Sequence, residues 1–229
     1  MSIADATADA LSLLFIGDDA LWEIIFTSLR VSVLALLAAS PLALLLAYVL
    51  AVSNFIGRRL CIALLQGFLS FPTVVIGLLL YMLFSRQGPL GAWQLLFTPE
   101  AMAVGQMLIA FPVLAVFALS ALQKNDPRAR ETAFTLGAGR FQAALIDLRE
   151  ARFGLVAALL AGFGRIISEV GCALMVGGNI AHHTRNITTA IALETGKGAF
   201  AEGIALGLVL IILALGTSAL LAVVQGGGK

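Results

Sequence analysis

The sequence predicts an all-α membrane protein with about five transmembrane helices, its N-terminus outside and its C-terminus in the cytoplasm. Hydrophobic residues make up 60% of the 229 residues and charged residues only 12%, whereas soluble domains carry about 25% charged residues. Long apolar stretches recur along the chain, and Lys and Arg gather in alternate loops between them. Membrane lipid is therefore an expected partner, and nothing in the sequence indicates nucleic-acid binding.

Each predicted span has the length that a membrane helix requires, which is about 20 mostly apolar residues. The spans cover residues 26–52, 60–84, 101–122, 154–176 and 203–224. Pro41, Pro72 and Pro112 fall inside the first three of them. Helices packed in a membrane bundle can re-satisfy the carbonyl groups that a proline frees, so these prolines are not expected to cancel the span assignments.

The chain begins with an acidic segment. Residues 1–20 are predicted to include an interfacial helix, because Asp9 and Ser12 lie beside a leucine-rich face. A cleaved signal peptide would start with positively charged residues, and residues 1–20 contain no Lys or Arg. The N-terminus is therefore expected to be retained.

Basic residues are unevenly distributed among the predicted loops. One set of loops holds nine of them: Arg58, Arg59, Lys124, Arg128, Arg130, Arg140, Arg149, Arg152 and Lys229. The opposite set holds three: Arg86, Arg185 and Lys197. Because cytoplasmic loops carry the excess of Lys and Arg, residues 124–152 and the C-terminus are predicted to be cytoplasmic. No repeat or soluble domain boundary is visible, so residues 1–229 are predicted to form a single transmembrane domain.

The cytoplasmic segment 124–152 is amphipathic rather than membrane-spanning. Asp126 and Pro127 favour the start of a helix. Apolar residues then follow a helix-turn-helix rhythm that glycines interrupt, at Phe134, Leu136, Phe141 and Leu145. A short amphipathic helix can dock into a groove on another protein or rest on lipid headgroups, and periodicity alone does not choose between these interpretations.

Part of this segment resembles the EAA loop of binding-protein-dependent ABC importer permeases, in which Glu-Ala-Ala is followed after three residues by Gly. The matching residues are Glu131, Thr132, Ala133 and Gly137. In that family the loop is a coupling helix that seats in a cleft of the cytoplasmic ATPase, and the resemblance implies the same role here. Thr132 stands where the family has Ala, and Arg149 stands where it has Pro. The helix after the loop is therefore expected to enter the membrane at a different angle.

Three further segments, 72–81, 85–91 and 165–197, resemble the tungstate branch of the molybdate and tungstate permeases. The resemblance implies a type I ABC importer permease fold in the cytoplasmic (inner) membrane of a bacterium or archaeon. It also implies a homodimer, cytoplasmic ABC ATPase subunits and an extracytoplasmic oxyanion-binding protein as partners, and no cofactor. Tungstate is the expected substrate, with molybdate, sulfate and phosphate as alternatives.

The chain is not expected to be an enzyme. The terminal Gly226-Gly227-Gly228-Lys229 lacks the spacing and the following helix of a phosphate-binding loop, so ATP hydrolysis is expected on a separate chain. A secondary transporter or channel that uses no ATPase is the alternative, although such proteins often contain inverted repeats. His182 and His183 lack further ligands nearby, so no metal site is expected.

Arg165 and Glu169 lie four residues apart inside a predicted span, so they share a helix face and can pair. Charges within a membrane are costly and usually face the bundle interior or a water-filled path. One interpretation is a structural ion pair. The other places Arg165 beside the translocation pathway, where its charge attracts a dianion and Glu169 moderates that attraction.

The segment after this span contains residues that interrupt helices. Gly177, Gly178 and Asn179 predict an irregular loop, which forms either a re-entrant gate on the outer side or a plain external turn. Thr188 and Thr189 offer hydroxyls to an oxyanion, although a solvated loop has the same composition.

Small residues recur every four positions at Gly154, Ala158 and Gly162, and again at Gly203 and Gly207. Such spacing allows two helix backbones to approach closely. It predicts packing either within one subunit or between subunits.

Overall fold

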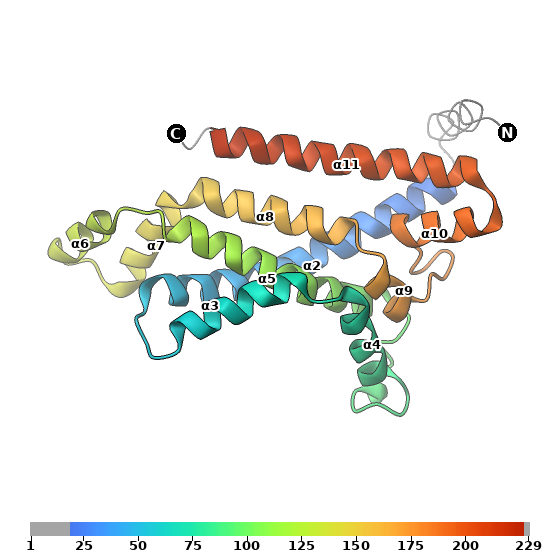
Figure 1. Cartoon of the computed structure of the whole chain (residues 1–229), viewed down its shortest axis with the longest axis horizontal. Helices are drawn as coiled ribbons and strands as arrows, with labels where there is room; N and C mark the ends of the chain where they lie inside the picture. The colour runs from blue at the N-terminus through green and yellow to red at the C-terminus, as the bar shows by residue number, and fades with distance from the viewer. Residues whose placement is uncertain (1–18, 227–229) are drawn as a thin grey trace.

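The computed structural model describes residues 19–226, which are helical apart from short connections (Figure 1). The long helices lie side by side along the molecule: α2 (Asp19–Val52), α5 (Pro99–Leu122), α8 (Arg152–Ile167) and α11 (Phe200–Gly226). The predicted all-α class is confirmed for this part of the chain. The interfacial helix predicted within residues 1–20 falls outside the described residues, except that Asp19 and Ala20 begin α2.

Shorter helices occupy the two ends and one side of this bundle. The first end holds α6 (Pro127–Thr135) and α7 (Arg140–Glu150), and the other holds α9 (Gly171–Gly177) and α10 (Ile187–Lys197). On the side lie α3 (Arg58–Gly67) and α4 (Thr73–Phe84), with much of α4 projecting away from the bundle (Figure 1).

Within residues 19–226, α2, α5 and α11 are each long and apolar enough to cross a membrane. The predicted spans 26–52, 101–122 and 203–224 are therefore confirmed. The other two are broken rather than continuous: α3 and α4 meet at 93°, and α8 and α9 at 63°. With each bent pair counted as one span, the described residues provide up to five, which agrees with the predicted number.

Proline explains the first break. Phe71 precedes Pro72 and is extended, with φ −69° and ψ 133°, because the proline ring disfavours helical geometry in the residue before it. Pro72 then stands immediately before α4. The bend at Pro72 makes α3 and α4 a broken span when the pair is counted as one, whereas α2 and α5 continue through Pro41 and Pro112. The expectation that the prolines do not cancel the span assignments agrees with this count.

Small side chains bring the central helices together. On α2 a stripe of alanines is completely buried, at Ala35, Ala39, Ala43 and Ala47, and α2 packs along α5. Van der Waals contact between closely approaching backbones drives helix association in a membrane. The sequence analysis did not identify this alanine stripe.

The glycine stripe of α8 also packs against α5. A Cβ added at Gly154 would lie 2.5 Å from Ala121 Cβ, and one at Gly162 would lie 2.9 Å from Leu114 Cδ2. Packing within one subunit is therefore confirmed for this stripe. Gly207 on α11 differs, because no atom lies within 4 Å of a Cβ built there.

Candidate functional site

The hairpin formed by α6 and α7 is shaped by local signals in the sequence. The Asp126 carboxylate accepts the Arg128 N–H at 3.0 Å, and Pro127 is the first residue of α6, so the predicted helix start is confirmed. At the other end Gly137 has φ +87°, a left-handed conformation that suits glycine. The Ala138 N–H donates back to the Ala133 carbonyl at 2.9 Å, which closes a Schellman turn.

This turn directly follows the EAA-like residues on α6. Ala133 is buried, whereas Glu131 and Thr132 on the same helix are exposed. Beyond the turn, the Gln142 Oε1 accepts the Gly139 N–H at 2.9 Å and fixes the start of α7. Large apolar side chains protrude from the resulting tip: Leu136 is 82% exposed and Phe141 is 83% exposed. The hairpin therefore presents two exposed apolar side chains beside a hydrogen-bonded turn.

The base of the hairpin contains a functional candidate that the sequence analysis missed. Asp147 on α7 is 7% exposed and lies within reach of Tyr48 and Arg130. The four-residue spacing of Ala143, Asp147 and Ala151 was visible in the sequence, and the structure buries all three. An acidic residue on an otherwise alanine-lined helix face indicates a buried polar contact.

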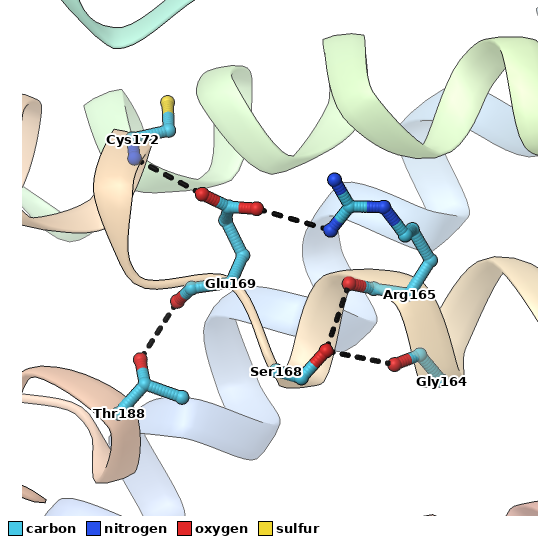
Figure 2. A network of polar contacts seen from close by, with 6 residues as sticks. All are labelled: Gly164, Arg165, Ser168, Glu169, Cys172 and Thr188. Atoms are coloured by element: carbon cyan, nitrogen blue, oxygen red, sulfur yellow. Dashed lines mark hydrogen bonds and ion pairs between the residues drawn. The ribbon is translucent and has the colours of Figure 1, made fainter. Parts of the chain in front are cut away.

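Arg165 and Glu169 do pair at the bend between α8 and α9. Arg165 Nη1 lies 3.1 Å from Glu169 Oε2 (Figure 2). The two side chains differ in environment: Glu169 is 4% exposed and Arg165 is 38% exposed. The Arg165 side chain is thus partly exposed, while the carboxylate that it pairs with is buried.

Glu169 also organises the bend itself. Its Oε1 accepts the Cys172 N–H at 3.1 Å at the start of α9, and its carbonyl accepts the Thr188 hydroxyl at 2.7 Å (Figure 2). The Ser168 hydroxyl lies 3.3 Å from the carbonyls of both Gly164 and Arg165 at the end of α8. These contacts satisfy backbone groups that a broken helix leaves unpaired, so Glu169 has a structural role whatever Arg165 does.

A cavity of about 530 Å³ lies beside Arg165, between the α3–α4 break, α5 and α8. Its lining is apolar apart from Thr73 and Arg165. The aromatic rings of Phe68, Phe71 and Phe111 contribute to its wall. A cation at the edge of an apolar cavity interacts with an anion more strongly than it would in water, because the local dielectric constant is lower.

The glycine-containing loop after α9 is packed against protein. As predicted, α9 ends at Gly177, and Gly178 has φ +69° and Asn179 has φ +53°. A Cβ would lie 2.6 Å from Met102 Sδ at Gly177, and 2.7 Å from the Phe97 ring at Gly178. The loop is therefore fitted closely to the start of α5.

The hydroxyls of Thr188 and Thr189 make internal hydrogen bonds. Thr188 donates to Glu169, and the Asn186 N–H donates to the Thr189 hydroxyl at 3.1 Å in the cap of α10. Both threonines are buried, at 4% and 0% exposure. The structure thus brings Thr188 to the Arg165–Glu169 pair as a support for the bend.

Comparison with known proteins shows which family the chain matches. Residues 39–225 match the model of the family described as binding-protein-dependent transport system inner membrane component. A probable anion ABC transporter permease protein of Haloferax volcanii is 44% identical over 198 residues, which are 84% of this chain and 85% of that protein. The tungstate uptake system permease protein TupB of Peptoclostridium acidaminophilum is 37% identical over 219 residues, or 96% of each chain.

The fold has a counterpart among solved structures. A chain of the MetNI methionine ABC transporter in an inward-facing conformation superposes with a TM-score of 0.65 at 19% sequence identity, over 98% of this chain and 99% of that one. At this identity the likeness concerns the fold. The resemblances to importer permeases and to the tungstate proteins, noted from the sequence, are both confirmed.

Proposed function

Because the chain belongs to the family of binding-protein-dependent transport system inner membrane components, we propose that it is the permease of an importer for tungstate. It works as a homodimer with two ATPase subunits on its cytoplasmic side and an oxyanion-binding protein outside. ATP binding draws the ATPases together, and the resulting movement of the hairpins switches the pathway between inward-open and outward-open states. The whole chain acts as one transmembrane domain.

The α6–α7 hairpin is the observation that carries the ATPase-coupled permease role, and the 37% identity to a tungstate uptake permease supports the substrate. Leu136 and Phe141 are more than 80% exposed, and the Schellman turn at Gly137 fixes where they point. Exposed apolar side chains at the tip of a hairpin suit a groove on a soluble partner. A helix that rests on lipid instead places its apolar side chains along one face. The hairpin also lies at one end of the bundle (Figure 1), where the excess of basic loop residues indicates the cytoplasm.

Arg165 is the residue that we propose to attract the substrate. Its guanidinium borders an apolar cavity of about 530 Å³, and Glu169 pairs with it at 3.1 Å. The unpaired charge of an arginine in such a cavity would hold a dianion strongly. The nearby carboxylate weakens that attraction, which allows the anion to leave. Selectivity then resides mainly in the external binding protein.

A second copy of the chain supplies the other wall of the pathway. The projecting helix α4 exposes a series of apolar side chains: Val74, Leu78, Leu79 and Met82. Leu79 also lines the cavity beside Arg165. Since α4 projects from the bundle (Figure 1) and lines this cavity, a partner packed against it would close the cavity into a shared pathway. The gate at Gly177, Gly178 and Asn179 would then lie at the outer end.

Competition between oxyanions tests the proposed substrate. With the complex and its cognate binding protein in vesicles, we expect unlabelled tungstate to abolish uptake of labelled tungstate, and molybdate to compete less strongly. Sulfate and phosphate at the same concentration should leave uptake unchanged. Equal competition by phosphate and tungstate would contradict the assignment, while leaving the permease role intact.

A further inference from the structure

A cluster of polar residues joins the base of the hairpin to the membrane-spanning helices. It consists of Tyr48 on α2, Asn125 after α5, Arg130 on α6 and Asp147 on α7, and it is called the Asp147 cluster below. The Tyr48 hydroxyl lies 3.4 Å from Asp147 Oδ2, and Arg130 Nε lies 3.8 Å from the same oxygen. The Asn125 side-chain amide donates to the Asp147 backbone carbonyl at 2.7 Å.

Asp147 is thus the point at which four segments meet. Its carboxylate contacts α2 and α6, its backbone contacts the end of α5, and the residue itself belongs to α7. Its side chain is 9% exposed and that of Arg130 is 29% exposed, so water screens the contacts of the carboxylate less than it would at the surface. The guanidinium of Arg130 also stacks over the Phe134 ring at 5.5 Å, which ties the cluster to the outer part of α6.

The contacts continue from the cluster toward the proposed pathway. Arg58 at the start of α3 donates through Nε to the Leu50 carbonyl near the end of α2, at 2.7 Å. The break that follows α3 carries Phe68 and Phe71, which line the cavity beside Arg165. A displacement of α2 at Tyr48 would therefore act on the start of α3, the helix whose far end adjoins the cavity wall.

We propose that Asp147 is the positioning residue that transmits movement of the hairpin to the membrane-spanning helices. This inference rests on the proposed function, because it assumes that an ATPase moves the hairpin. A cavity of about 250 Å³ adjoins the cluster and is lined by Tyr48, Leu122, Arg130 and Asp147, so there is room for the cluster to shift. Losing the carboxylate charge would leave the hairpin surface in place but would loosen its attachment to α2.

The test is Asp147→Asn in the full complex with the ATPase and the binding protein. We expect the ATPase to co-purify normally and to hydrolyse ATP, while transport per ATP falls at least about fivefold, the lower end of typical coupling between distant sites. Arg130→Gln should act in the same direction, since it removes the other half of the ion pair. Glu150→Gln is the matched control, because Glu150 is an exposed carboxylate on the same helix and should leave the ratio unchanged.

An unchanged transport-to-ATP ratio in Asp147→Asn would overturn the inference, as would an equal fall in Glu150→Gln. If Asp147→Asn does not assemble, the same two results are sought in Arg130→Gln. The proposed function fails differently: the unmodified chain would then bind no ATPase at all, which would overturn both claims.

Discussion

Replacing Gly137 with leucine should abolish both co-purification of the ATPase and ATP-driven uptake, while the chain still reaches the membrane at its normal level. Two causes act together. With φ +87° at this position, a residue with a Cβ pays about 1–2 kcal/mol for the left-handed conformation, so the turn that presents Leu136 and Phe141 is distorted. The added side chain also occupies space where the proposed partner approaches, since no atom of this chain lies within 4 Å of a Cβ there.

Two further variants separate these causes. Asparagine tolerates the left-handed conformation, so Gly137→Asn should keep the turn. More ATPase should therefore co-purify with Gly137→Asn than with Gly137→Leu. Gly216→Leu places the same bulk in open space on α11, at a glycine without positive φ, and should leave association and uptake unchanged. Full activity in Gly137→Leu would show that the hairpin does not couple this chain to an ATPase.

Neutralising the ion pair at the bend should cost most of the transport without disrupting the fold. In the double variant Arg165→Met with Glu169→Gln, the new amide oxygen can still accept the Cys172 N–H that Glu169 Oε1 now accepts at 3.1 Å. Buried ion pairs can often be replaced by neutral groups without loss of stability, and here only the Glu169 half is buried. We therefore expect normal assembly, with uptake reduced at least about tenfold, equivalent to about 1.4 kcal/mol in the rate-limiting barrier.

This double variant distinguishes the two roles of Arg165 better than exchanging the charges would. An arginine at position 169 has no acceptor for the Cys172 N–H, and its larger charged group would occupy a site where the present side chain is 4% exposed. A charge exchange would fail for structural reasons under either interpretation. Uptake close to the unmodified rate in the neutral double variant would instead show that the pair is purely structural.

Local signals in the sequence predicted much of the architecture. Length and hydropathy located α2, α5 and α11, because the hydrocarbon thickness fixes the length of apolar helix that is needed. The hairpin start at Asp126 and the interruption at Gly137 were equally local, since capping and left-handed turns depend on a few neighbouring residues. These features needed no knowledge of the tertiary structure.

The bends and polar clusters were less accessible from the sequence. Whether a threonine hydroxyl is available to a ligand depends on distant partners: Thr188 bonds to a carbonyl 19 positions earlier. Asp147 likewise lies 99 positions from Tyr48. Hydropathy averaged over a window also treats Phe71-Pro72 as part of a continuous span, although the proline fixes a sharp break there. Contacts of this kind become visible only once the helices are packed.

The most direct test of the whole account is uptake of labelled tungstate into vesicles that contain the purified chain, its ATPase and ATP, with the binding protein outside. The account predicts uptake that requires all three proteins and stops when ATP is omitted or cannot be hydrolysed. Uptake by the chain alone at the same rate, driven by an ion gradient or by the substrate gradient, would contradict it and would identify a secondary transporter or channel.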